Sequence, residues 1–530
     1  MDRCQVRIRF RVRQFEVFAR LAGRRLDSYY EIISHSHKII TDMRSHLILY
    51  SSSSSSQRQN PLGVLLIFAI LAVLVSCHSI DSQDNQLDLD AALEQCDIQV
   101  HRALAQLSVG GVIDTTAMPR NIASGDSCWT CRPLCAEEWC SGFWPGILWL
   151  DYEALLMQER PVDSLLRASA LNATKAMHRV VDRPVLDHDL GFLVFCSAGT
   201  AIRVLNRELE RKDLTPQQRD EDQAALVIFR QLCLRAADSL STLFNPTVGT
   251  ILSWPRNVTK FGGHNTIMDN MINLELLCWA AKDRESGEER SERLRDIAVR
   301  HAETTRQHHF RPNATCYHVA VYDTLDGHFI HGKTHQGFSD SSTWARGQAW
   351  AVYGFTMMAR EVKGMANGEW STHQSSFLDM ACRAADAFIS HLPKDYVPFW
   401  DFDDPRIATS PVDHPEAASA TVAPRDASAA AVVASALIEL SELVADADGL
   451  CATSPDGHES RSDYYLSTAK RILASLASTH YQGAPDNCAF LKHSTGHHPA
   501  GSEIDLPIIY ADYYYLEALN RLKARQPKEK

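Results

Sequence analysis

The chain has 530 residues, of which 45% are hydrophobic and 22% are charged, and its formal net charge is −12 at pH 7. A chain of this length and composition can bury a large core, which excludes disorder of the whole chain. The negative charge argues against nucleic acid as a partner, because nucleic acid requires a contiguous basic surface.

Residues 1–80 differ in composition from the rest and are expected to form a separate N-terminal region. Residues 3–25 are rich in arginine, residues 51–56 are all serine, and residues 61–77 form an apolar run. That run is slightly short for a spanning helix, which needs about 20 residues, and it suits the apolar part of a signal peptide.

Basic residues precede the apolar run and aspartates follow it, so we expect everything after the run to be exported. Cleavage of the run, with translation starting nearer Met43, is favoured by its length. The alternative is a retained signal anchor with the catalytic domain outside, and only then is a membrane a partner. Export agrees with three Asn-X-Ser/Thr sequons, at Asn172, Asn257 and Asn313, each compatible with a glycosylated surface loop.

Four of the 14 cysteines lie close together just before the first strongly apolar segment. They are Cys128, Cys131, Cys135 and Cys140. Four thiolates at such short spacing can close a tetrahedral zinc site. Disulfides or an irregular stapled loop are favoured instead, because an exported protein seldom builds an all-cysteine zinc site.

Residues 85–525 read as helix after helix, without the alternating Val, Ile and Thr runs that mark strands. Six segments are apolar on nearly all sides and are expected to be buried. They are residues 146–156, 189–205, 265–282, 343–362, 426–444 and 510–522. Amphipathic segments lie between them. Six inner and about six outer helices make an all-α (α/α)6 barrel, although an irregular all-α bundle has the same periodicity.

Ionisable and aromatic residues gather near the start of each apolar segment. They include Trp139, Asp187, His188, Asp189, Asp269, Arg346, Trp350, Arg425 and Asp426. If these helix ends share one face of the barrel, carboxylates, aromatic rings and an arginine line one pocket. That composition is typical of a sugar site, because sugar rings stack on indoles and hydroxyls bond to carboxylates.

Six blocks follow one another over about residues 120–523: WCSGFWPGILWLDYE, DHDLGF, NTIMDNMINL, THQGFSDSSTWARGQAWAVYGF, RDASAAAVVASALIEL and YADYYYLEALNRL. Together they resemble the unsaturated glucuronyl hydrolases, a family of (α/α)6-barrel glycosidases. The resemblance implies action on the 4,5-unsaturated uronic acid that polysaccharide lyases leave at the non-reducing end of oligosaccharides. Hydration of its C4=C5 enol ether then releases the neighbouring sugar, without a metal or other cofactor.

Carried over position by position, the resemblance assigns the general acid/base to Asp269 and the second carboxylate to Asp189. It assigns substrate binding to Trp139, His188, Trp254, His318, Gln336, Arg346 and Trp350. Arg346 is expected to receive the substrate carboxylate, because its guanidinium is planar and always charged.

Local rules leave alternatives open at these positions. A carboxyl among the isoleucines and methionines around Asp269 is desolvated and can hold a proton near neutral pH, and Asn273 shares its helical face. Taken alone, such an aspartate is more often a capping or pairing residue. Asp187 is expected to cap the helix beginning near Leu190.

Without the resemblance, Arg346 would be interpreted as an ion-pair residue and Trp350 as a core tryptophan. Arg425 and Asp426 are interpreted as structural, since adjacent opposite charges commonly neutralise each other. Cys140 departs from the family, which more often has threonine or serine there. Two rival functions stay open: an unsaturated rhamnogalacturonyl hydrolase, and a secreted sugar-binding barrel that lost its chemistry.

Overall fold

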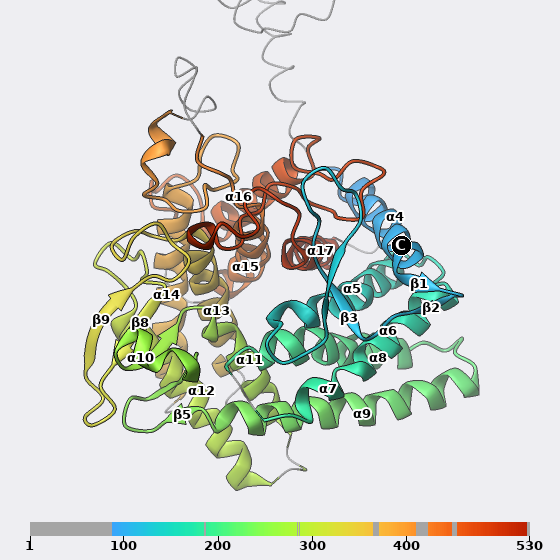
Figure 1. The fold of residues 1–530 in the computed structure, drawn as a ribbon, viewed down its shortest axis with the longest axis horizontal. Helices are drawn as coiled ribbons and strands as arrows, with labels where there is room; N and C mark the ends of the chain where they lie inside the picture. The colour runs from blue at the N-terminus through green and yellow to red at the C-terminus, as the bar shows by residue number, and fades with distance from the viewer. Residues whose placement is uncertain are drawn as a thin grey trace, which may run out of the picture. The chain divides into compact units, whose positions relative to one another are not determined.

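The apolar segments of the sequence form the inner wall of a barrel in the computed structural model of the protein (Figure 1). The inner helices are α5 (Phe143–Met157), the π-helix η2 (Gly191–Gly199) continued by α8 (Thr200–Leu209), α11 (Asn270–Ala281), α13 (Ala345–Lys363), α15 (Ala427–Ala445) and α17 (Ile509–Ala524). Each inner helix packs against the next, and α17 closes the ring against α5.

Amphipathic helices alternate with the inner ones along the sequence and surround them. They are α4 (Leu89–Leu107), α6 (Ser164–Ala176), α9 (Pro216–Ser241), α12 (Glu288–His308), α14 (Trp370–Ser390) and α16 (Arg461–Leu476). Short helices α7 (His178–Val181) and α10 (Val258–Phe261) lie in the connections. Alternation of six inner with six outer helices confirms the predicted (α/α)6 barrel.

Residues 87–184, 187–283, 285, 287–363, 370–409, 422–447 and 453–526 are described by the structure. They fall in one unit, Asp84–Lys530. The predictions for region 1–80, including the apolar run 61–77, lie outside the described residues. Within them, α15 is long and apolar enough to cross a membrane by length and composition, but most of it is buried in the barrel.

Small antiparallel sheets interrupt the helices, contrary to the prediction of an uninterrupted series of helices. The pairs are β1 (Ser108–Val109) with β2 (Val112–Ile113), β3 (Ala117–Asn121) with β4 (Thr130–Pro133), and β5 (Phe244–Asn245) with β6 (Thr250–Ile251). A three-stranded sheet has the order β7 (His264–Ile267), β8 (Val319–Tyr322), β9 (Phe329–Lys333). Strands of two to five residues are too short to show an alternation that separates them from helix, and β6, β7 and β8 are buried throughout.

The three-stranded sheet positions the candidate general acid. The predicted third helix, residues 265–282, begins instead as strand β7, and α11 starts only at Asn270. In the β7–β8 pair, Ile267 lies opposite Val319. The backbone N–H of the following residue, Met268, donates to the carbonyl of His318 at 2.9 Å. Asp269 therefore stands at the junction of strand and helix, beside His318.

The clustered cysteines are free thiols, so the disulfide prediction is wrong. The zinc alternative fails too, because their sulfurs do not converge on a metal site among the described residues. The hairpin places Cys131 on β4, whereas Cys140 is buried beyond the loop and its sulfur accepts a hydrogen bond from Arg120 at 2.8 Å. This spread along a strand and a loop separates the four side chains.

The sequons differ in their surroundings. Asn313 is exposed in the loop after α12, as predicted, but Asn172 is exposed within helix α6. Asn257 is half-buried and lines a cavity. Asn172 is therefore on the surface but on a helix and not on a loop.

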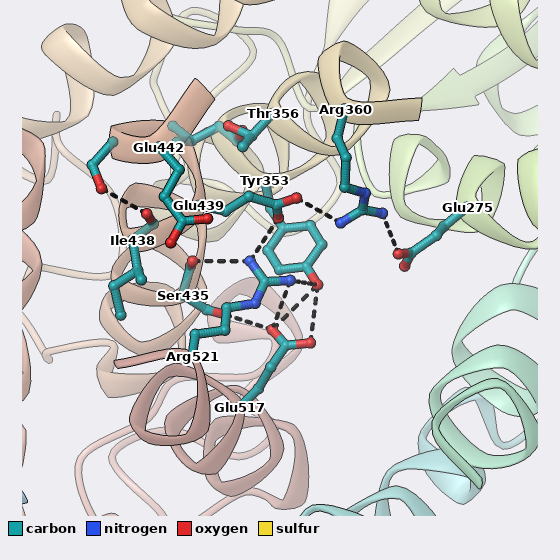
Figure 2. Close-up of polar contacts among 12 residues, drawn as sticks. Glu275, Tyr353, Thr356, Arg360, Ser435, Ile438, Glu439, Glu442, Glu517 and Arg521 are labelled. Carbon is teal, nitrogen blue, oxygen red and sulfur yellow. Dashed lines mark hydrogen bonds and ion pairs between the residues drawn. The ribbon is translucent and has the colours of Figure 1, made fainter. Parts of the chain in front are cut away.

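Arginines and glutamates fill the carboxyl ends of the inner helices (Figure 2). Arg521 donates to Glu439 at 2.8 Å and to the Tyr353 hydroxyl at 3.0 Å, and that hydroxyl donates to Glu517. Arg360 donates to Glu439 at 2.7 Å. These paired charges surround a cavity of about 590 Å³ and join α13, α15 and α17.

Glu439 is the acceptor that both arginines share, and we expect Glu439→Gln to lower the free energy of unfolding by about 2 kcal/mol. Burial alone would raise the pKa of Glu439, but Arg360 and Arg521 outweigh it and hold this pKa below its usual 4.5. The stabilisation is thus present above pH 4.5 and lost as the pH falls through the lowered value. Chemical unfolding from pH 7 to pH 3 measures it; an equal pH dependence in both proteins contradicts the assignment.

Candidate active site

A second cavity, of about 400 Å³, opens at the amino ends of the inner helices. Six predicted site residues line it: Trp139, His188, Asp189, Trp254, Asp269 and Gln336. The predicted gathering of carboxylates and indoles at this end of the barrel therefore occurs. Of the other three, His318 lies directly behind Asp269, whereas Arg346 and Trp350 do not line the cavity.

His188, which lies beside Asp189, is held by hydrogen bonds that begin on α11. The Asn273 carboxamide accepts the Phe192 N–H at 3.2 Å, so its NH2 group must donate to His188 Nδ1, which lies 3.1 Å away. His188 Nδ1 is thus an acceptor, and the ring proton sits on Nε2, 3.4 Å from an Asp189 carboxylate oxygen. Asn273, which was expected to share a helical face with Asp269, orients His188.

Asp269 has a matching imidazole. His318 Nδ1 accepts from the backbone N–H groups of His335 and Gln336, at 3.2 and 3.3 Å. Its Nε2 therefore carries the proton and faces Asp269 Oδ2 at 3.5 Å. The Asp269 side chain makes no capping bond to α11, so both candidate carboxylates face the cavity beside an imidazole N–H.

Burial sets the protonation of this site. It lowers the pKa of His188 to about 4 and that of His335 to about 3, so both rings are neutral at pH 7. Burial, together with the charges of Asp187 and Asp269, raises the pKa of Asp189 well above the ordinary aspartate range. Asp189 is therefore a carboxyl able to keep a proton and to donate a hydrogen bond.

Aromatic rings form the walls of the cavity. Trp139 lies 5.0 Å from Tyr510 between ring centroids, and Trp254 stacks on Phe261 at 5.8 Å. Trp254 also packs edge-on against His335 at 5.1 Å. Such surfaces suit the apolar faces of a sugar ring.

Arg346 does not have the position expected for it. Its side chain is 1% exposed and donates to Asp426 at 2.6 Å and to the carbonyls of Thr495 and Gly496 at 2.5 Å. With its donors taken up inside the barrel, the guanidinium is not free for a substrate carboxylate. Trp350 is fully buried and packs on Phe192, so it is a core tryptophan.

Asp187, Arg425 and Asp426 also have partners other than those expected from the sequence. Asp187 does not cap the helix: it bonds to the Asp189 N–H at 3.4 Å and pairs with Arg256 at 2.7 Å. Arg425 and Asp426 are structural but do not neutralise each other. Arg425 pairs with Asp395, whereas Asp426 caps α15 through the Ser428 N–H.

Several lining residues were absent from the sequence-based prediction. They are Arg120, Arg256, Lys260, His335, His497, Glu503 and Tyr510. Most come from connections between helices, where periodicity gives no signal. Of these residues, His335 and Tyr510 lie within the six sequence blocks quoted above, and the other five lie outside them.

An (α/α)6 barrel whose cavity sets two buried carboxyls among indole rings defines a carbohydrate-active enzyme, and specifically a glycoside hydrolase. Comparison with known proteins agrees. The unsaturated glucuronyl hydrolase of Formosa agariphila is 37% identical over 392 residues, which are 73% of this chain and 80% of that protein. The enzyme of the same name from Bacillus sp. strain GL1 is 31% identical over 390 residues, 73% of this chain and 86% of its own.

Solved structures give the same result. The crystal structure of an unsaturated glucuronyl hydrolase specific for heparin superposes with a TM-score of 0.63 at 34% identity, over 82% of this chain and 96% of that one. No protein-family model matches the chain. By its identity to curated relatives over most of their length, the chain belongs to the unsaturated glucuronyl hydrolase family.

Turnover is expected to fall as the pH drops toward 4. His188 is neutral in the fold with a pKa of about 4, and its protonation removes the acceptor that Asn273 needs. Because the unfolded protein takes up this proton near pH 6.5, the free energy of unfolding also falls from pH 6.5 downward. A kcat profile and melting temperatures between pH 4 and 8 measure both; an acid limb near pH 6.5 would show a charged, exposed imidazole.

Proposed function

We propose that this enzyme releases the 4,5-unsaturated uronic acid from the non-reducing end of lyase-generated oligosaccharides by hydrating its C4=C5 enol ether. The observation that carries this proposal is the pair Asp189 and Asp269, which face one cavity and each lie beside an imidazole N–H. The named activity of the relatives and the aromatic walls support it.

Asp269 is assigned the proton transfers. Its carboxyl protonates C4, the carboxylate that remains takes a proton from water, and the water oxygen bonds to C5. Asp269 is thereby protonated again. The C5–O5 bond of the resulting hemiketal breaks as the C5 hydroxyl proton passes to O5, which leaves a ketone at C5 and a hemiacetal at C1. The hemiacetal collapses to the aldehyde, and the glycosidic oxygen leaves with the hydroxyl proton as the neighbouring sugar. Its position at the start of α11, facing the cavity, gives it access to both reactants.

Asp189 and the two imidazoles hold the sugar and the acid in place. A protonated Asp189 donates to a sugar hydroxyl, and the His188 N–H fixes the direction of that carboxyl. The His318 N–H stabilises Asp269 in its charged state, between the two proton transfers. Both rings serve as hydrogen-bond donors, so neither competes as an acid.

The acidic substrate needs a cation that the protein has not already paired. Arg120 pairs with Glu138 and Glu503, and Arg256 pairs with Asp187. Among the described residues that line the cavity, Lys260 has no carboxylate partner and contacts His335 Nδ1 at 3.3 Å. We assign to Lys260 the attraction of the uronate.

Export of the enzyme is part of the same proposal. It is supported by the apolar run 61–77 followed by aspartates and by the exposed sequons at Asn172 and Asn313. Asn257 is different: a glycan there would compete with substrate, because Asn257 lines the cavity. The relatives named for chondroitin disaccharides and for heparin support a substrate among glycosaminoglycan fragments.

Asp269→Asn is expected to lower kcat by about 10²-fold to 10⁴-fold, because the amide fills the same space but cannot carry the proton. Loss of the ultraviolet absorbance of the unsaturated acid follows turnover, and melting temperature reports the fold. Glu439→Gln, at the other end of the barrel, is the control that loses stability but keeps its kcat. Near-normal turnover by a folded Asp269→Asn enzyme would remove Asp269 from the mechanism.

A comparison of the acid substrate with its uncharged methyl ester tests how charge is recognised. Lys260→Gln is expected to lower kcat/KM for the acid by about tenfold and to leave the ester nearly unchanged. Arg346→Lys is expected to lower both equally, together with the melting temperature, because Arg346 supports the loop at Gly496. Acid-selective loss on Arg346→Lys instead would restore the carboxylate role first expected for it.

A further inference from the structure

Asp151 is a buried carboxylate without a partner. It lies in the middle of α5 with 0% of its surface exposed, and neither carboxylate oxygen has a hydrogen-bond donor among the described residues. A charged carboxylate is stable in such a place only beside a compensating cation. Asp151 does not line the catalytic cavity, so the reaction does not explain it.

Two residues of the neighbouring helix α4 point to what the compensating group is. Asp97 and His101 are four residues apart and share a face of α4, which packs on α5. Each of the three side chains offers a ligand atom, and all three atoms lie within 4.8 Å of one another. The Asp97 Oδ1 and His101 Nδ1 atoms are 2.9 Å apart, close to the spacing of about 3 Å between adjacent ligands on a metal with bonds of about 2.1 Å.

His101 is oriented as metal-binding imidazoles are. Its Nε2 bonds to Asp163 Oδ2 at 2.5 Å, and its Nδ1 faces the carbonyl oxygen of Asp97 at 2.9 Å as well as Asp97 Oδ1. Without a metal, Nδ1 is the donor to these oxygens, so a metal takes the place of the Nδ1 proton. A carboxylate on the far ring nitrogen fixes the tautomer that presents the other nitrogen to a metal. Asp163 is itself fixed, because its other oxygen caps α6 through the N–H groups of Leu165 and Leu166.

The charges of the cluster leave room for a divalent cation. Asp97, Asp151 and Asp163 carry three negative charges when ionised, and Arg160 offsets one of them by donating to Asp97 Oδ2 at 2.6 Å. Once the metal has replaced the Nδ1 proton of His101, the imidazole is neutral and the remaining charge of the cluster is −2. One divalent ion balances it.

We propose that Asp97, His101 and Asp151 bind a divalent transition-metal ion, Zn²⁺ or Mn²⁺, that joins helices α4 and α5 and, through Asp163, the start of α6. Two carboxylates with one imidazole favour these ions over Ca²⁺ and Mg²⁺, which prefer oxygen ligands alone. The ion is structural: none of its ligands reaches the catalytic cavity. The competing occupant is a proton on Asp151.

The test is metal content and melting temperature of the full-length protein. The purified protein is expected to carry about one Zn²⁺ or Mn²⁺ per molecule by elemental analysis. EDTA is expected to remove the ion and to lower the melting temperature. Adding ZnCl2 or MnCl2 at a concentration about a hundredfold above Kd is expected to raise the melting temperature again by about 5 °C. Turnover of the unsaturated disaccharide by the folded protein is expected to be unchanged after chelation. A failure of the metal proposal therefore leaves the proposed function intact, and the reverse also holds.

Asp151→Asn and His101→Gln are each expected to abolish both metal content and the response to EDTA. His101 is 40% exposed at its side chain, so His101→Gln decides the outcome if Asp151→Asn does not fold. Asp512→Asn is the matched control: a buried aspartate of α17 whose oxygens already accept the N–H groups of Phe490 and Leu491, so its loss leaves metal binding intact. Absence of metal and of any response to added ions, or full binding by both variants, overturns the proposal and leaves a protonated Asp151.

Discussion

One carboxamide holds the catalytic end of the barrel together. Asn273 joins α11 to η2 by accepting the Phe192 N–H and donating to His188, and the contact is so close that a Cβ at Gly191 would lie 2.4 Å from its oxygen. Only glycine allows this approach. The separation of Asp189, two residues before Gly191, and Asp269, four residues before Asn273, is thereby fixed. The wider π-helical turn of η2 is the local adjustment that accommodates it, as such turns often do at functional sites.

The barrel itself was predictable because its buried inner helices have sequences that are apolar on nearly all sides. A segment such as 426–444, apolar on all sides and rich in alanine, can pack only inside, and it forms α15. The strands were not predictable. A run such as His264–Ile267 is buried on both faces and four residues long, so it merges with the helix that follows it in any pattern of hydrophobicity. This is why the sequence placed Asp269 within a helix and the structure places it at a helix start.

The site was predictable only where a residue's neighbours in sequence are also its neighbours in space. The resemblance to the family predicted Asp189, Asp269, Trp139 and Trp254 as site residues, and all four line the cavity. For Arg346 the sequence gives a charge but no partner, since Asp426 lies 80 residues away and the carbonyl of Gly496 lies 150 away. Bonds over such distances depend on the closure of the ring, which periodicity does not describe. The cysteine cluster shows the same limit, because spacing alone says nothing of where the side chains point.

The two ends of the barrel treat charge in opposite ways. At the carboxyl ends of the helices, Arg360 and Arg521 meet glutamates directly, and these pairs stabilise the fold. A cation as close to Asp189 would lower its pKa and remove its proton. At the catalytic end arginines also pair with Asp187 and Glu503, but the side chains beside Asp189 and Asp269 are imidazoles, and burial keeps the His188 ring neutral by lowering its pKa. A neutral imidazole N–H favours the ionised carboxyl less than a cation does, so burial of His188 is a condition for a carboxyl at Asp189 that holds a proton near neutral pH.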